Sequence, residues 1–294
     1  MPEGKIIKAL SGFYYVLGEE GVVQCRGRGV FRKNKVTPLV GDEVVFQAEN
    51  VTDGYIMEVK DRKNELIRPP IANVDQAILV FSAVEPEFST ALLDRFLVLV
   101  EYNQIQPLIC ITKMDLLEDN RRYQFEQYAT DYRKVGYDVI LTSAKTLFGM
   151  VELEPYLDGK ISVFAGQSGV GKSSLLNAIR PELELKTSGI SHHLGRGRHT
   201  TRHVELIKIG KNGLVADTPG FSSLEFTEIE PEELNFCLPE ISTHSENCKF
   251  RACLHLSEPK CAVKMAVDQG EIPHYRYEHY KNFLQEIKDR KPRY

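Results

Sequence analysis

Short alternating runs of apolar and polar residues fill the first part of the chain. Each run is bounded by a glycine-containing turn, a pattern that predicts a β-strand with one buried face. The five expected strands cover residues 5–10, 13–17, 22–25, 43–48 and 55–59. Five short strands at this spacing suit a small barrel of the OB type, with an SH3-like barrel as a close alternative. We therefore expect an all-β domain over residues 1–67.

The pattern changes after Arg68-Pro69-Pro70, which we interpret as a linker. Continuous apolar runs at 74–81, 107–111, 137–141 and 161–165 predict buried strands, and helical patterns at 91–100 and 119–135 separate them. Strands that alternate with helices predict a parallel sheet covered on both faces. The runs 203–209 and 214–216 predict a hairpin after these elements. We place this α/β domain at residues 68–225.

The amino-acid composition changes again near residue 225. From Glu225 to Glu246 the chain carries seven acidic residues and no Lys or Arg. A helical tail follows, in which aromatic residues alternate with basic ones. We expect residues 226–294 to form a separate, α-rich C-terminal domain.

Composition limits the function classes that remain. A net charge of −4 over 294 residues argues against a uniformly basic nucleic-acid binder, so any basic surface is local. We expect no membrane attachment, because no apolar run approaches the length of a span and no signal-peptide pattern opens the chain. Six cysteines are too few for a disulfide framework in a chain of this size. We expect a protein of the reducing cytoplasm.

A basic stretch lies within the expected barrel. Between Gly21 and Gly41 there is no acidic residue, and Phe31 offers an aromatic face. The basic residues are Arg26, Arg28, Arg32, Lys33 and Lys35. A solvated loop is one interpretation. Basic loops on small barrels more often contact a phosphate backbone, with bases stacked on an aromatic ring, so we favour RNA binding.

Residues 166–173 carry the phosphate-loop pattern G-x-x-x-x-G-K-S. An expected strand precedes the pattern and an apolar helical run follows it, which is the context that a phosphate loop requires. Lys172 would reach the β- and γ-phosphates, and the Ser173 hydroxyl would hold Mg²⁺. The predicted nucleotide contacts in this loop are Gly166, Gln167, Ser168, Gly169, Val170, Gly171, Lys172, Ser173 and Ser174.

A second magnesium element follows the strand expected at 214–216. The sequence there is Asp217-Thr218-Pro219-Gly220, and Asp217 lies 44 residues after Ser173. An aspartate at the end of a strand can hold the Mg²⁺ shell through water, while the Gly220 N–H can contact the γ-phosphate. We assign this tetrapeptide to the same nucleotide site.

Two motifs at strand ends predict guanine recognition. In Thr112-Lys113-Met114-Asp115, the carboxylate can accept hydrogen bonds from N1–H and the 2-amino group of guanine, which adenine lacks. Hydrogen bonds to a charged group contribute roughly 1.5–3 kcal/mol each, enough to select GTP over ATP. The Lys113 stem can cover the base plane. Backbone N–H groups of Ser143, Ala144 and Lys145 could contact the guanine oxygen.

Three cysteines and a histidine lie within 14 residues near the C-terminus. They are Cys248, Cys253, His255 and Cys261. A Cys₃His set can complete the tetrahedral coordination of Zn²⁺, with no position open for catalysis, so we predict one structural zinc ion. Buried reduced cysteines are the alternative. We interpret Cys25, Cys110 and Cys237 as packing residues.

Together these motifs resemble a known family. The guanine-reading elements precede the phosphate loop, and the magnesium elements come last, which permutes the order found in most GTPases. With a barrel before it and a Cys/His cluster after it, the chain resembles the circularly permuted ribosome-assembly GTPases called RsgA, YjeQ or YloQ. The resemblance covers the whole chain. It implies a slow GTPase that binds GTP and GDP, is stimulated by the small (30S) ribosomal subunit, binds its rRNA and acts late in its maturation. Separately, we expect the chain to act as a monomer.

The resemblance also implies roles for the basic segment 186–203. This segment resembles switch I, in which Thr200 or Thr201 would supply the hydroxyl and carbonyl that sense Mg²⁺ and the γ-phosphate, with Thr200 the preferred candidate. Phe221 occupies the position where many GTPases place a glutamine that orients the attacking water. An apolar side chain cannot polarise water, so we expect His199 to take that role.

One residue departs from the family pattern. The guanine motif usually begins with asparagine, which can bridge the base and the phosphate loop, and here Thr112 offers only a hydroxyl. This replacement is expected to weaken nucleotide binding, while Asp115 still selects guanine. Two other functions stay open from sequence: a nucleotide kinase, and an RNA-binding module that uses GTP as a regulatory clamp.

Overall fold

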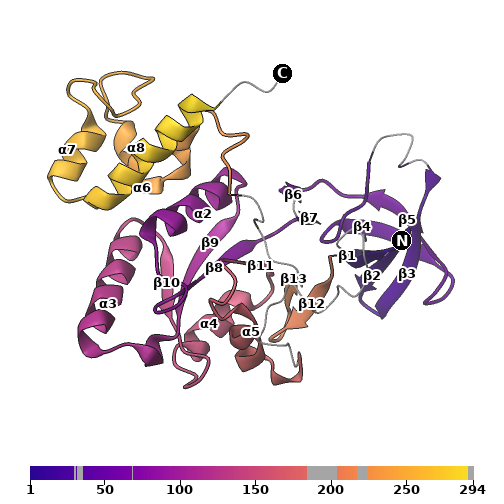
Figure 1. Ribbon diagram of the computed structural model, residues 1–294. Helices are drawn as coiled ribbons and strands as arrows, with labels where there is room; N and C mark the ends of the chain where they lie inside the picture. Colours follow the sequence, from indigo (N-terminus) through magenta and orange to yellow (C-terminus); the bar gives the residue numbers. More distant parts are fainter. Residues whose placement is uncertain are drawn as a thin grey trace.

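The computed structural model describes residues 1–29, 31, 36–67, 69–183, 204–216, 221 and 224–290. A small barrel lies at one end, a sheet covered by helices in the middle, and a helical C-terminal unit at the other end (Figure 1). Among the residues described, no helix is both long enough and apolar enough to span a lipid bilayer.

Five strands close into the N-terminal barrel. They are β1 (Glu3–Leu10), β2 (Phe13–Gly18), β3 (Gly21–Gly27), β4 (Glu43–Ala48) and β5 (Gly54–Val59), in the order β1-β2-β3-β5-β4. Only β3 and β5 pair in parallel, and β1 closes the barrel against β4. Inward-facing side chains such as Ile6, Val16 and Ile56 are fully buried. This closed five-stranded arrangement confirms the OB-type prediction.

The prediction for Phe31 was wrong. Its side chain is only 9% exposed and packs in the barrel's hydrophobic cluster. A large apolar ring gains more from burial than from exposure to water, so it is not available to stack on a base. Phe13 is only partly buried, and the Arg26 guanidinium lies 5.0 Å from the centre of its ring. Arg26 and Arg28 are exposed, whereas Arg32, Lys33 and Lys35 lie outside the described residues.

The segment interpreted as a linker is instead a hairpin. Strands β6 (Glu65–Ile67) and β7 (Pro70–Ala72) pair antiparallel, with Pro70 at the first position of β7. Arg68 lies outside the described residues. Proline is tolerated at the first residue of a strand because no ladder hydrogen bond is then lost. The prolines therefore mark a turn into a strand rather than an unstructured connection.

The central sheet has six strands. They are β8 (Gln76–Ser82), β9 (Gln106–Thr112), β10 (Asp138–Leu141), β11 (Ile161–Ala165), β12 (Leu206–Ile209) and β13 (Gly213–Ala216), in the order β10-β9-β8-β11-β13-β12. All neighbours pair in parallel except the β12–β13 hairpin. The predicted parallel sheet and its terminal hairpin are both confirmed.

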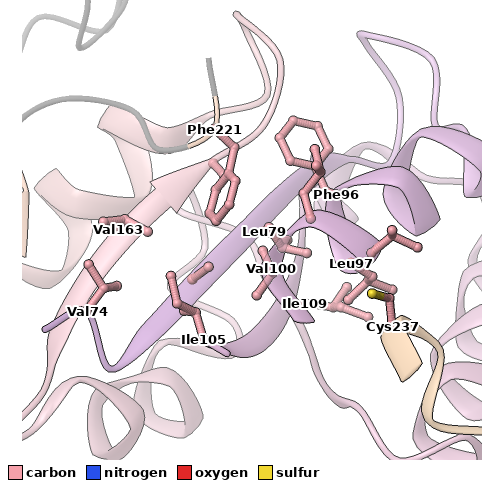
Figure 2. Packing of buried hydrophobic residues seen from close by; sticks show 14 of the residues in the cluster. Val74, Leu79, Phe96, Leu97, Val100, Ile105, Ile109, Val163, Phe221 and Cys237 are labelled. Carbon is pink, nitrogen blue, oxygen red and sulfur yellow. The ribbon is translucent and has the colours of Figure 1, made fainter. Parts of the chain in front are cut away.

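Helices cover both faces of this sheet, as predicted. Helices α2 (Thr90–Tyr102) and α3 (Asp119–Lys134) pack on one face, and α4 (Met150–Leu157) and α5 (Lys172–Ile179) pack on the other. Alternate residues of β8 divide between the faces: Leu79 lies with α2 residues such as Leu97 (Figure 2), whereas Ile78 belongs to the cluster of α4 and α5. The central strands β8, β9 and β11 are buried on both faces, so their sequences are nearly continuous hydrophobic runs.

The C-terminal unit is α-rich. Its elements are the 3₁₀ helix η4 (Leu234–Cys237), α6 (Pro239–Ser245), α7 (Ala262–Asp268) and α8 (His274–Asp289). In Figure 1, α8 lies beside α2 of the central domain. Cys237 of η4 points toward the α2 residue Leu97 and the strand residue Ile109 (Figure 2).

A buried ion cluster fastens α8 to the central domain. Arg276 of α8 is fully buried and pairs with Asp94 of α2 and with Glu240 of α6, the latter at 2.5 Å between Nε and Oε1. Asp94 also accepts hydrogen bonds from Tyr132 Oη, at 2.7 Å, and from His279 Nδ1, at 2.6 Å. Removing one partner would leave a buried charge without compensation, which typically costs about 3–5 kcal/mol. The cluster therefore fixes how the C-terminal unit sits.

A pH-dependent contribution to stability follows from Glu101 at the end of α2. Burial raises the pKa of this carboxyl from its ordinary value of 4.5 to about 7. The folded state therefore holds the proton more tightly than the unfolded state, and the associated stability is lost as the pH rises from 4.5 through 7. Glu101→Gln should raise the unfolding free energy at pH 8 by about 1–2 kcal/mol, allowing for partial exposure.

Denaturant titrations at several pH values check this expectation. The advantage of the Glu101→Gln variant over wild type should shrink toward zero as the pH approaches 4.5. Glu154→Gln, at an exposed position of α4, is the matched control and should leave stability unchanged at every pH. A Glu101 advantage that is independent of pH would contradict the argument.

Candidate functional site

The candidate site lies where the strand order of the central sheet reverses. Strands β8 and β11 are neighbours, but the chain continues from β8 to β9 on one side of the pair, and from β11 to the β12–β13 hairpin on the other side. Loops that leave adjacent parallel strands in opposite directions open a crevice beyond the carboxyl ends of those strands. The predicted phosphate loop leaves β11 at this point.

Glycine is required at the start of that loop. Gly166 has φ +138°, and a Cβ atom there would lie 2.1 Å from the Val80 carbonyl oxygen of the neighbouring strand. No side chain fits at that distance, so the loop turns against β8 only because residue 166 has none. Gly171, at φ +101°, then leads into α5. Backbone N–H groups at the start of a helix favour an anion, which agrees with the predicted phosphate site.

Lys172 lies folded over this loop. Its ammonium group donates hydrogen bonds to the carbonyl oxygens of Gly166, at 2.7 Å, and Gln167, at 2.6 Å. Burial lowers the pKa of this side chain to about 8. A buried ammonium is stabilised by nearby negative charge, which phosphate oxygens would supply. Ser173, in the first turn of α5, is buried beside it.

The first two residues of the guanine motif bond directly to the phosphate loop. The Thr112 hydroxyl at the end of β9 lies 2.5 Å from the Val170 carbonyl oxygen and 3.2 Å from that of Phe81. The Lys113 ammonium donates to the Gly169 carbonyl oxygen at 2.8 Å. The motif and the loop are therefore parts of one hydrogen-bonded structure, although 56 residues separate Lys113 from Gly169.

Asp115 is held by a residue of the other guanine motif. The buried Ser143 hydroxyl donates to Asp115 Oδ1 at 2.6 Å and accepts a hydrogen bond from the Thr146 N–H at 3.1 Å. Sequence reasoning assigned only backbone contacts to residues 143–145 and missed this bond. The two segments are 28 residues apart, and only the parallel pairing of β9 with β10 brings them together.

Several predicted residues cannot be placed. Asp217, Gly220, His199 and Thr200 lie outside the described residues. Phe221 is described, is 9% exposed, and packs in the same buried cluster as Val163 and Leu79 (Figure 2). An aromatic side chain held in the core does not orient a water molecule.

The four predicted metal ligands meet in the C-terminal unit. The candidate donor atoms of Cys248, Cys253, His255 and Cys261 all lie within 4.8 Å of one another. Cys248 Sγ is 3.9 Å from Cys261 Sγ, and His255 Nδ1 is 3.3 Å from Cys261 Sγ. Zn–S bonds of about 2.3 Å and Zn–N bonds of about 2.0 Å give tetrahedral edges of about 3.5–3.8 Å. The cluster can therefore hold a metal ion.

Neighbouring residues orient the histidine of this cluster. His255 Nε2 lies 3.0 Å from Asn235 Oδ1, so this nitrogen carries the proton and Nδ1 is free to bind a metal. Tyr277 of α8 donates its hydroxyl hydrogen to the His255 carbonyl oxygen at 2.5 Å. Nothing in the sequence pattern pointed to Asn235, which lies 20 residues from His255 and becomes its neighbour only through the packing of η4.

Comparisons with known proteins agree with this arrangement. The RsgA GTPase family model matches residues 59–227, and the RsgA N-terminal domain model matches residues 3–56. Small ribosomal subunit biogenesis GTPases RsgA from Bacillus cereus and Bacillus subtilis are each 69% identical to the chain, with 100% of both partners covered.

Two solved structures share the whole fold. The crystal structure of YloQ, a circularly permuted GTPase, is 64% identical, with a TM-score of 0.87 over 100% of this chain and 97% of that one. YjeQ from Thermotoga maritima is 41% identical, with a TM-score of 0.88 over 99% of each chain. The permuted order of motifs is therefore shared with proteins of known structure.

Proposed function

The chain belongs to the RsgA GTPase family, and we propose that it hydrolyses GTP to GDP and phosphate on the small (30S) ribosomal subunit during that subunit's late maturation. Its curated relatives are named small ribosomal subunit biogenesis GTPases. The observation that carries the proposal is the direct bonding of Thr112 and Lys113 to the phosphate loop, which supports a guanine site beside a phosphate site.

Guanine selection is proposed for Asp115. The Ser143 hydrogen bond fixes one carboxylate oxygen, so the carboxylate is oriented before a base arrives, and less ordering accompanies binding. The Lys113 stem would cover one face of the base. Backbone N–H groups at Ala144 and Lys145 would contact the guanine oxygen O6.

The proposed reaction is in-line attack of water on the γ-phosphate. Lys172 would exchange its two carbonyl partners for phosphate oxygens and stabilise the charge that develops there. Bound Mg²⁺ would neutralise the β- and γ-oxygens, held by Ser173 with Thr200 and the shell of Asp217. The Gly220 N–H would contact the γ-phosphate.

Binding to rRNA is proposed for the barrel. The exposed side chains of Arg26 and Arg28 lie at and just after the end of β3, in the basic stretch that contains no acidic residue. Cationic side chains on a small barrel suit a phosphate backbone. We propose domain boundaries near residues 67 and 225, a monomer, and a cytoplasmic location.

For the Cys₃His cluster we propose one structural zinc ion. Three thiolates and one imidazole are a ligand set that zinc prefers, and four protein ligands leave no position for a substrate. The hydrogen bonds from Tyr277 and Tyr280 of α8 to the loop carbonyls of His255 and Leu254 would make this metal part of the packing of the C-terminal unit.

GTP turnover with and without ribosomal subunits tests the main proposal. The full chain should hydrolyse GTP slowly alone and faster by about tenfold or more with small subunits, because catalytic groups supplied or ordered by a partner raise GTPase rates by large factors. Lys172→Ala should abolish the stimulated rate. Turnover that small subunits do not change would favour the regulatory clamp, and phosphate transfer to an added nucleoside monophosphate would favour the kinase.

A kinetic comparison tests His199. His199→Ala should lower kcat by about 100-fold, the usual size of an acid–base or water-orienting contribution, and leave GTP affinity nearly unchanged. His244→Ala, a histidine beside Glu271 in the C-terminal unit, is the control and should turn over normally. A normal kcat in the His199 variant would remove this residue from the mechanism.

Metal analysis tests the zinc proposal. The purified full chain should carry one zinc per molecule, and Cys253→Ser combined with Cys261→Ser should lose it, because two of four ligands are gone. Cys237→Ala removes a buried cysteine outside the cluster and should retain zinc. Wild type without zinc, or a double variant that keeps it, would refute the assignment.

A further inference from the structure

The Thr112 hydroxyl is already engaged by the protein. Its oxygen lies 2.5 Å from the Val170 carbonyl oxygen. Within the described part of the chain its one other hydrogen-bond partner is the Phe81 carbonyl oxygen, at 3.2 Å. A carbonyl can only accept, and a hydroxyl has a single hydrogen to donate. The closer contact takes that hydrogen. Thr112 is also only 4% exposed, so its hydroxyl has no donor left for a ligand.

Two other polar side chains of the guanine motifs, Ser143 and Lys113, are engaged as well. Ser143 gives its hydrogen to Asp115. The Lys113 ammonium uses two of its three hydrogens on the carbonyl oxygens of Glu85 and Gly169, which directs it toward the phosphate loop. Asp115 is an acceptor. Thr112, the last residue of β9, therefore offers the base no donor, while Asp115 offers an acceptor on a fixed carboxylate.

Guanine has more hydrogen-bonding groups than this site can pair. Its N1–H and 2-amino groups are donors, and its O6 and N7 atoms are acceptors. In the proposed function, Asp115 pairs with the two donors, and backbone N–H groups at residues 144 and 145 pair with O6. The remaining acceptor, N7, needs a separate donor. Residue 112 is bonded to the phosphate loop and lies three residues before Asp115, so a longer donor side chain at this position would be the one to reach N7.

We propose that Thr112 restricts base recognition to the Watson–Crick edge of guanine and O6, so that N7 is left unread. This inference rests on the proposed function, because it concerns the same nucleotide site. An asparagine at position 112 would reach one bond further than the threonine hydroxyl and would carry two N–H hydrogens and an oxygen. It could bond to the loop and to N7 together, whereas threonine serves only the loop.

The same geometry gives Thr112 a separate role in shaping the loop. Val170 is buried between two glycines of positive φ, Gly169 and Gly171, so its carbonyl direction depends on bonds from outside the loop. The threonine hydroxyl supplies one. Thr112 is therefore a positioning residue for the phosphate loop, while base selection stays with Asp115.

Nucleotide binding to the full chain separates these roles. The probes are GDP and 7-deaza-GDP, in which a carbon replaces N7, with ADP as the reference for base selection. Wild type should bind GDP and 7-deaza-GDP with equal affinity within about twofold, because no hydrogen bond to N7 is lost. Thr112→Asn should prefer GDP over 7-deaza-GDP by about three- to tenfold, the value of one neutral hydrogen bond.

Two further variants serve as controls. Thr112→Ser keeps the hydroxyl and should behave like wild type. Thr112→Val keeps the shape but loses the bond to Val170, so it should weaken GDP and 7-deaza-GDP equally, by about three- to tenfold. This equal loss is what a positioning role predicts, and a base contact would instead produce unequal losses.

The outcomes that overturn the inference differ from those that overturn the proposed function. If wild type binds 7-deaza-GDP fivefold or more weakly than GDP, or if Thr112→Asn discriminates no better than wild type, residue 112 does not decide the reading of N7. If neither guanine nucleotide binds more tightly than ADP, the guanine site itself is wrong.

Discussion

The close approach of β11 to β8 is the constraint on which the site depends. These strands pair in parallel up to Ala165 and Leu79, and the next residue of the chain, Gly166, passes so close to the Val80 carbonyl that a Cβ atom would lie 2.1 Å from it. Because the loop turns at this point, Val170 and Gly169 lie within reach of Thr112 and Lys113 from β9. The proposed phosphate and base sites thus lie across three adjacent strands, β9, β8 and β11, and the permuted order of the motifs does not change this geometry.

The two flanking units attach to this sheet by different physical means. The C-terminal unit is fixed by the buried cluster of Arg276, Asp94 and Glu240, whose charges are costly to separate once they are out of water. The barrel contacts the sheet through more exposed groups: Lys8 of β1 pairs with Glu205, beside β12, at 2.7 Å. Exposed ion pairs contribute little, about 0–1 kcal/mol. The charged contacts of the C-terminal unit therefore hold it to the sheet more firmly than the exposed ion pair holds the barrel.

The Cys₃His cluster is connected to the central domain through packed side chains. Tyr277 and Tyr280 of α8 bond to carbonyls of the ligand loop, Arg276 on the same helix pairs with Asp94 of α2, and α2 packs on β8 and β9. A structural metal would hold the ligand loop in the shape that these tyrosines require. The cluster contributes to the placement of α8, which lies far from α5 and the predicted phosphate loop in Figure 1, and this suits a structural role and not a catalytic one.

Much of this protein was determined by local sequence. Alternating apolar runs predicted the barrel strands and continuous apolar runs predicted the buried sheet, because burial on one face and burial on two faces produce different periodicities. The spacing of residues 166–173 and of the Cys₃His set predicted the phosphate loop and the metal ligands, because in each case the residues lie close together in the sequence. Tertiary structure alone decided the OB strand order over an SH3-like one, the burial of Phe31, and the hairpin at Pro70. It also decided the bonds Ser143–Asp115, Thr112–Val170 and Asn235–His255. These join residues 20–58 positions apart, and their distances depend on which strands and helices become neighbours, which no local pattern encodes.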